Sequence, residues 1–423
     1  MAGDGVEIVH LSSIVRRPLV DATGDRLGRV RDVVASFADK PHPPLVGLVV
    51  TMGGRDLFVP IRKVAGFEAR TVRFAGRRVD LRRFERRPGE LLLARDLSTH
   101  HLINFVGGHL IRANEIELAN VGGTWEVVGV DPSARPVWRH LLPRRHGRQA
   151  VPGSIVDWAS IEPFVANVPT ARLRIPYRKL KRLHPALIAD LVEAASHEEG
   201  KEIIDAVRHD RELEADVFEE LDVEHQVEFL NARSDGEAAR LLASMAPDDA
   251  ADLIIAVDQE RRLPILDLLP EAQQRKVRSL LNYNPETAGG LMSPDFLALP
   301  VSAPIGEVLG AVAESRAPVE ALNVAFGVDE EGVVVGSVSI VRLLKEDPRA
   351  LLGSVIDHDP PHVHPDWDLG AIARKMSDFN LIVVPVLDPA HRSILGVVTV
   401  DDVLEQMLPT GWRGDYGPMS PED

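Results

Sequence analysis

The stretch Tyr-Asn-Pro-Glu-Thr-Ala-Gly-Gly-Leu-Met, residues 283–292, lies where the sequence pattern of the chain changes. Before it, apolar residues recur at helical spacing, and similar segments begin at Leu221, Met245 and Leu269, which are 24 residues apart. A fixed period of this length predicts a superhelical stack of short helices, here over residues 183–282. After the stretch, strand and helix patterns alternate.

Two copies of a β-α-β-β-α pattern follow, about 60 residues apart. Helices are expected over Ile305–Glu314, residues 369–377 and Val400–Met407, and strands over Val324–Val328, residues 333–340 and 381–387, and Ile394–Thr399. The two copies predict one packed α/β pair over residues 291–408. The last residues, 411–423, are rich in Gly and Pro and are predicted to be disordered.

The N-terminal part has shorter apolar runs that are separated by Gly and Pro. Strands are expected over residues 8–11, 29–37, 45–52 and 56–61, which predicts a small β-barrel over residues 6–88. A similar rhythm, with strands over residues 110–118, 125–131 and 155–161, predicts a second, degenerate barrel over residues 89–168. The order of these strands and glycines resembles the PRC-barrel family. The fold class is therefore multidomain α+β, with small β-barrels, an all-α superhelical stack and a tandem α/β pair.

The net charge changes sign near residue 182. Residues 1–182 carry a net charge of +12, and residues 183–423 carry −28. A carboxylate density this high opposes compaction unless cations neutralise it. Hard divalent cations take oxygen ligands, so the acidic half indicates a cation-responsive region.

Three segments together resemble the cytosolic half of MgtE-type magnesium channels. They are residues 283–292, the Pro-Asp-Asp-Ala-Ala-Asp segment at 247–252, and the Gly-Val-Val-Thr-Val-Asp-Asp-Val segment at 396–403. The resemblance implies an MgtE N-type helical domain over 183–282 and tandem CBS domains over 291–408. In that family, Mg²⁺ screens carboxylates between these two parts and holds them in a closed state. The resemblance thus implies a magnesium-sensing regulatory protein that signals to a partner.

The same resemblance implies which residues would contact magnesium. Asp248, Asp249 and Asp252 match the family's acidic segment and would face carboxylates of the CBS pair, namely Asp366, Asp368, Asp401 and Asp402. On a helix, Asp248 and Asp252 are i,i+4 neighbours, an arrangement that is destabilising unless it is neutralised. The alternative is that Asp248 and Asp249 merely favour a helix N-terminus. One of Asp366 and Asp368 is expected to cap the following helix.

A second ligand class is an adenine nucleotide. Thr399 and Asp402 fit the nucleotide motif of CBS domains, in which Asp accepts ribose hydroxyls and Thr meets a phosphate. The first repeat has Arg342 where the family has Asp, and Asn380 replaces a residue that is usually acidic. These substitutions leave open a third interpretation, a scaffold that works without a ligand.

The resemblance and the distribution of arginines indicate which partners the protein is expected to have. The resemblance implies a homodimer through the CBS domains, and a protein partner, such as a separately encoded membrane channel, is expected for the PRC-like region. The arginine runs at 77–87 and 135–148 show no recognition helix, so no nucleic-acid partner is expected.

No catalytic motif is found, which predicts a protein that is not an enzyme. No apolar stretch is long enough to span a membrane and no secretory signal is present, so the chain is expected to be soluble and cytoplasmic, and not itself a pore. Three histidines in the linker, His358, His362 and His364, are expected to be solvated.

Overall fold

The computed structural model describes residues 7–37, 40–76, 83–98, 100–133, 155–164, 177–315 and 317–408. They fall into two compact units, residues 1–213 and 214–417, and each is considered by itself. The tail at 411–423, the arginine run at 135–148 and most of the basic connector at 169–182 lie outside the described residues. In the described ranges, no helix combines the length and apolar character that a membrane crossing requires.

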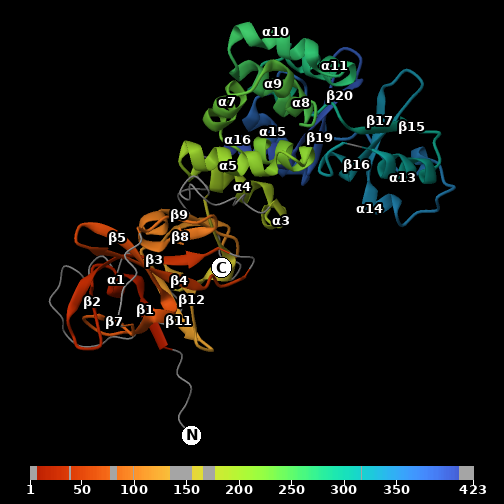
Figure 1. Cartoon of the computed structure of the whole chain (residues 1–423). Coiled ribbons are helices and arrows are strands. Elements are labelled where there is room, and N and C mark those ends of the chain that lie inside the picture. Colours follow the sequence, from red (N-terminus) through yellow and green to blue (C-terminus); the bar gives the residue numbers. More distant parts are fainter. Residues whose placement is uncertain are drawn as a thin grey trace. The chain divides into compact units, whose positions relative to one another are not determined.

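The first unit opens with β1 (Glu7–His10) and α1 (Leu11–Ile14), followed by the largest sheet (Figure 1). Its strands run in the order β5-β4-β3-β2-β7-β6, and β8 also pairs with β3. The hairpin between β4 and β5 turns at Gly53 and Gly54, which both have positive φ, as a two-residue hairpin requires. The strands are β2 (Pro18–Val20), β3 (Arg26–Ser36), β4 (Leu45–Met52), β5 (Arg55–Pro60), β6 (Val64–Phe67), β7 (Val72–Phe74) and β8 (Glu90–Leu92).

Two smaller sheets complete the β region. One has the order β1-β11-β12-β13 and the other β10-β9-β14. The single strand expected over 110–118 is broken into β10 and β11, and the one expected over 155–161 is interrupted by the turn η3 (Trp158–Ser160). The strands are β9 (His101–Asn104), β10 (His109–Arg112), β11 (Glu115–Val121), β12 (Thr124–Asp131), β13 (Val156–Asp157) and β14 (Ile161–Pro163).

One apolar core spans the whole β region. It joins residues from the first block, such as Leu19 and Val30, with Leu118 and Trp158 from the second. Strand β1 also pairs with β11, across the expected boundary at residue 88. The two blocks therefore fold around a common core instead of forming two separately packed barrels, and the likeness to PRC barrels stays a prediction.

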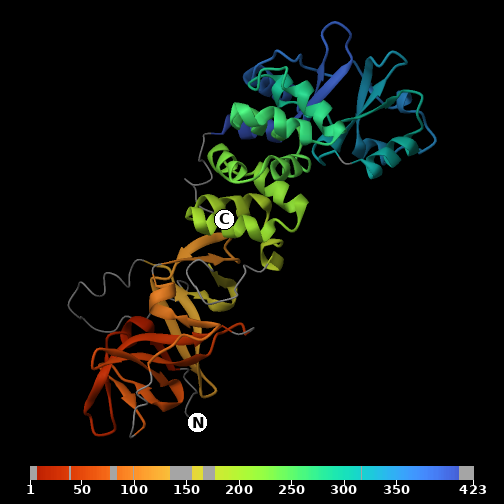
Figure 2. The ribbon, with the colours of Figure 1, turned by 45° about the horizontal axis from the view of Figure 1, so that its top comes forward.

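Three helices extend the first unit: α3 (Tyr177–Leu180), α4 (Pro185–Glu193) and α5 (His197–Val207). They lie against β9, β10 and β14 (Figure 2). Lys179 Nζ lies 2.6 Å from Glu162 on β14, and His101 on β9 lies 3.2 Å from Glu199 on α5. The helices are thus joined to the β region by polar contacts.

From α6 to α11, a helix begins every 12 residues. The helices are α6 (Arg211–Glu219), α7 (Val223–Asn231), α8 (Asp235–Leu242), α9 (Pro247–Ala256), α10 (Gln259–Leu268) and α11 (Glu271–Leu280). Asp222 and Ser234 cap α7 and α8 with their side chains, and Pro247 occupies the first turn of α9. The starts of α7, α9 and α11 are 24 residues apart, which confirms the period seen in the sequence.

The two α/β repeats follow. The first contains β15 (Leu297–Pro300), α13 (Ile305–Glu314), β16 (Val324–Val328), β17 (Val334–Ser339) and α14 (Ile340–Leu343), and the short strand β18 (Asp357–His358) completes its sheet. The second contains α15 (Leu369–Phe379), β19 (Val383–Leu387), β20 (Ile394–Thr399) and α16 (Val400–Met407).

The two repeats exchange their edge segments. Strand β18, which opens the second repeat, pairs with β17 of the first. Conversely Ser293, which precedes the first repeat, pairs with Val397 on β20 through hydrogen bonds of 2.8 and 2.9 Å. An apolar cluster with Phe326 and Leu387 joins both sheets. The repeats therefore form one interlocked pair.

The stretch 283–292 forms the junction that makes this exchange possible. Its short helix α12 (Ala288–Leu291) docks on the second repeat, because Ala288 N donates to Trp367 O at 2.9 Å and Gly289 N donates to Pro365 O at 2.9 Å. A Cβ atom at Gly290 would lie 2.5 Å from the backbone of Pro285. This close approach explains why the stretch contains glycine.

Candidate functional site

The first side of the candidate site is the N-terminus of α9. Asp248 and Asp249 lie in its first turn, and the N-cap residue Ala246 offers no side chain to bond the free N–H groups. The N–H of Ala246 instead donates to Glu219 Oε1 at the end of α6, at 2.7 Å. Two helices thus bring three carboxyl groups together.

The second side is the N-terminus of α16 in the second repeat. Thr399 caps this helix in a capping box with Asp402, whose carboxylate accepts from Thr399 N at 2.9 Å and from Thr399 Oγ1 at 2.8 Å. The pairing fixes Asp402 at the start of the helix. Glu405 follows one turn later and is exposed.

These two sides meet in what we call the acidic cluster: Glu219, Asp248, Asp249, Asp252, Asp402 and Glu405. Burial raises the pKa of Asp248 to about 7, and the negative charges of Asp402, Glu219 and Asp252 add to that rise. Burial, then Asp248, Glu219, Asp402 and Glu405, raise the pKa of Asp249 well above its usual value. The helical stack and the CBS-like pair therefore face each other with like charges.

Other members of the cluster show the same effect. Burial raises the pKa of Glu219 to about 7, against the lowering effect of the Ala246 hydrogen bond. Burial also raises the pKa of Asp402, although its two bonds from Thr399 lower it. The pKa of Asp252 rises to about 6 by desolvation, but this side chain is exposed, so solvent screens the effect on stability.

Asp248 has an additional feature. Its Oδ1 atom is buried and has no hydrogen-bond partner among the described residues. A buried carboxylate oxygen without a donor loses its hydration without compensation. The structure therefore leaves one oxygen of the cluster in need of a proton, a donor or a cation.

The remaining predicted residues are Asp366, Asp368 and Asp401. Asp368 is the N-cap of α15 and accepts from Ala371 N at 2.8 Å, which confirms the capping prediction, and Asp366 is exposed. Neither is among the charges that raise the pKa of Asp248. Asp401 is exposed, and burial together with Glu320 and Glu220 raises its pKa.

Four of these acidic residues were not predicted from the sequence: Glu219, Glu220, Glu320 and Glu405. Glu219 comes from the end of α6, and two helices separate α6 from α9 in the chain, so its position depends on how α6 packs beside α9. The adjacent pair Glu219-Glu220, directly before the repeat that begins at Leu221, is the only signal that the sequence offers.

The cluster concentrates charge but does not form a ready coordination shell. Within the described residues, no group of three or more His, Asp or Glu side chains is arranged to hold a metal ion directly. His358, His362 and His364, which are described, form no such group either. Asp248 and its neighbours do supply the oxygen atoms that Mg²⁺ prefers, and Mg²⁺ usually keeps several of its waters. The residues present thus fit a hydrated magnesium ion.

The predicted nucleotide residues already have partners in the chain. Thr399 and Asp402 bond to each other in the capping box. At the corresponding place in the first repeat, Ser339 caps α14 and Arg342 forms an ion pair of 3.0 Å with Asp357. Asn380 ends α15 with a positive φ of 52°, a conformation that asparagine tolerates better than most residues. A local backbone requirement thus accounts for this asparagine.

Comparisons with known proteins agree with this architecture. The family model of the MgtE intracellular N domain matches residues 183–286, and that of the CBS domain matches residues 288–349 and 352–409. Residues 183–409 are an MgtE N domain followed by a pair of CBS domains. The predicted resemblance is therefore confirmed for this half of the chain.

Curated relatives and a solved structure extend the comparison. The magnesium transporter MgtE of Thermus thermophilus is 32% identical over 196 residues, which cover 45% of this chain and 43% of the transporter. MgtE of Enterococcus faecalis is 29% identical over 130 residues, which cover 31% of this chain and 28% of the transporter. The matched region thus spans less than half the length of these relatives. The cytosolic domain of the Mg²⁺ channel MgtE, solved in complex with ATP, is 28% identical with a TM-score of 0.50 and covers 55% of this chain and 93% of that domain.

Proposed function

We propose that this chain is an intracellular, magnesium-responsive regulatory protein, in which Mg²⁺ holds the N domain against the CBS pair through the acidic cluster. The observation that carries the proposal is that Asp248 and Asp249 are buried close to Asp402. Burial raises the pKa of all three carboxyl groups, and the charge of Asp402 adds to the rise at Asp248 and Asp249. The relatives named above are magnesium transporters, and this supports magnesium as the cation.

The electrostatics indicate how such a response works. At neutral pH without a cation, the cluster must bind protons or bear the repulsion of its charges. A divalent cation removes both costs, because it attracts every carboxylate around it and can approach Asp248 Oδ1, to which no described residue donates a hydrogen bond. Mg²⁺ therefore favours the closed arrangement over any in which α9 and α16 separate. Such an ion shifts the equilibrium only through its higher affinity for the closed state.

The test compares the radius of gyration and the melting temperature of the full chain with and without millimolar Mg²⁺. We expect a smaller radius and a higher melting temperature with Mg²⁺. The Asp248→Asn/Asp249→Asn variant should lose most of both effects. As a matched control, Asp258→Asn/Asp267→Asn removes two exposed carboxylates of α10 outside the cluster. An unchanged radius and melting temperature in the unmodified chain would refute the proposal.

A second candidate function is adenine-nucleotide binding in the second CBS repeat. It is favoured by the solved MgtE domain in complex with ATP and by the presence of Thr399 and Asp402 here. Asp402 is already engaged by Thr399, so a nucleotide would have to replace those bonds. Calorimetric titration with ATP tests this second function. ATP binding that is lost in Thr399→Ala supports it, and the absence of heat at sub-millimolar ATP argues against it.

The CBS pair is also proposed as the site of homodimer formation. Several large apolar side chains on or next to its helices are exposed, including Leu344 at the C-cap of α14 and Leu404 and Met407 on α16, at 66%, 53% and 57%. Exposed apolar groups on helices of a pair favour contact with a second copy. Sedimentation of the full chain and of Leu404→Glu/Met407→Glu tests this, and a monomer at micromolar concentration would contradict it.

A further inference from the structure

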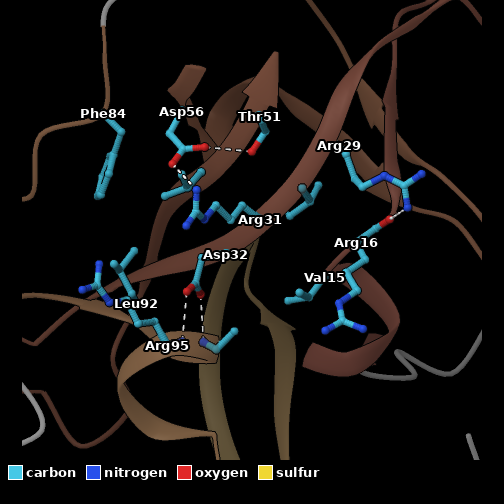
Figure 3. Close-up of a pocket in the computed structure, with 13 residues that line it drawn as sticks. Val15, Arg16, Arg29, Arg31, Asp32, Thr51, Asp56, Phe84, Leu92 and Arg95 are labelled. Atoms are coloured by element: carbon cyan, nitrogen blue, oxygen red, sulfur yellow. Dashed lines mark hydrogen bonds and ion pairs between the residues drawn. The ribbon is translucent and has the colours of Figure 1, made fainter. Parts of the chain in front are cut away.

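The first unit contains a hollow that the proposed magnesium response does not use. It encloses about 840 Å³ beside strands β3 and β4 and the π-helical turn η2 (Leu93–Leu97) (Figure 3). This volume is typical of sites that hold small molecules. Four arginines from three segments line it: Arg16 after α1, Arg29 and Arg31 on β3, and Arg95 on η2. All four are exposed to solvent.

The two carboxylates that line the hollow are already engaged. Asp32, which is 5% exposed, accepts from the N–H groups of Val33, Ala94 and Arg95 and so holds η2 in place. Asp56 accepts from Thr51 Oγ1 at 2.8 Å and from Arg31 at 2.7 Å. Among the described residues, the guanidinium groups of Arg16 and Arg95 have no carboxylate partner. The lining therefore carries a surplus of positive charge.

The backbone at Arg16 provides an independent observation. Arg16 has a φ of +69°, in the left-handed region that non-glycine residues rarely adopt. Its N–H donates to Val30 O at 2.8 Å, and Arg29 Nη1 donates to its carbonyl at 3.1 Å, so neighbouring residues hold this conformation. A glycine or asparagine would meet the backbone requirement at lower cost. An arginine in such a position indicates that its side chain has a use.

The arginines do not converge on one point. Figure 3 shows Arg31 in the middle, with Phe84 and Arg95 toward one side and Arg16 and Arg29 toward the other. A ligand that engages both sides needs anionic groups at more than one position. Guanidinium groups match phosphate and carboxylate oxygens with paired hydrogen bonds. We propose that this hollow binds a small organic or inorganic anion that carries two or more phosphate or carboxylate groups.

The test is calorimetric titration of the full chain in magnesium-free buffer, with pyrophosphate in one arm and citrate in the other. Pyrophosphate lacks the base and ribose of a nucleotide, so its binding is distinct from nucleotide binding in the CBS repeat. Arg16→Gln/Arg95→Gln should weaken binding about tenfold, as expected when two charge-assisted contacts are lost. Asp56→Asn should strengthen binding about threefold, because it frees Arg31 while an amide can still bond Thr51.

The matched control is Arg26→Gln/Arg70→Gln, which removes the same positive charge from exposed positions outside the hollow. We expect this control to bind as the unmodified chain does. Binding of pyrophosphate alone would assign a phosphate ligand, and binding of citrate alone a carboxylate ligand. No heat with either anion, or equal weakening in the control and in the hollow variant, would overturn the proposal. Circular dichroism of each variant verifies that it is folded.

Discussion

Replacing Asp248 with Asn should stabilise the protein at neutral and basic pH. The pKa of this carboxyl is raised to about 7 from an ordinary 3.8, a rise of about three units. At 1.36 kcal/mol per unit, full ionisation costs the folded state about 4 kcal/mol. Because Asp402 and Glu219 contribute to the raised pKa and titrate together with Asp248, we expect about half of this, about 2 kcal/mol, to be recovered in Asp248→Asn. For a unit of this size, that corresponds to a rise in melting temperature of about 4–8 °C.

The assay is thermal unfolding of both proteins in magnesium-free buffer at about pH 8 and about pH 5. At the lower pH, Asp248 is protonated and resembles asparagine, so the difference should nearly vanish. Asp258→Asn, an exposed N-cap of α10 that makes no side-chain capping bond, serves as the control and should show no such pH-dependent gain. If Asp248→Asn is no more stable than the original at pH 8, or if its gain is equal at both values, the electrostatic reasoning is wrong.

Three further predictions follow from the described contacts. Without Mg²⁺, the stability of the folded protein should fall as pH rises from about 4 to about 7, because the acidic cluster binds protons more tightly in the folded protein than in the unfolded chain. With Mg²⁺, the melting temperature should depend less on pH. A melting temperature that rises with pH in the absence of Mg²⁺ would contradict this reasoning. Glu214→Gln should cost about 3 kcal/mol in urea unfolding, because it leaves the buried guanidinium of Arg233, 2.8 Å from Glu214, without its counter-charge. Gly290→Ala should lower the free energy of unfolding by about 2 kcal/mol, because its Cβ would lie 2.5 Å from the Pro285 backbone. Gly236→Ala, which has open space around it, should not lower it. Equal melting temperatures for the two variants would refute the packing argument.

The helical half could be predicted well because its signals are local. Each repeat has a polar or proline start followed by apolar residues at helical spacing, and α7, α9 and α11 begin at the expected interval. Several elements of the CBS pair, such as β16, β20 and α16, have the predicted bounds. The β region was predicted less well, because Ala113 and Asn114 interrupt an apolar run without a glycine or proline to mark the break. The common core also depends on pairing between β1 and β11, which are about 100 residues apart and leave no local trace.

The acidic cluster shows the same limit. The sequence pointed to Asp248, Asp249 and Asp402, which the structure brings together, and to Asp366 and Asp368, which are not among the charges that raise the pKa of Asp248. A resemblance to a family can indicate which positions of this chain carry the family's acidic residues. The charges that surround each of these residues depend on how the helices pack. The magnesium role of these residues stays a prediction.

The exchange of edge segments between the CBS repeats has a consequence for the synthesis of the chain. The sheet of the first repeat gains its last strand only when β18 has been made, and the edge at Ser293 has no partner until β20, about 100 residues later, has been made. During translation, the first sheet is complete only after β18 has left the ribosome, and the second only after β20 has left it. The two repeats therefore form one folding unit. Deleting or duplicating one repeat alone would leave an open sheet edge, so we expect such changes to be retained in evolution only when they involve both repeats.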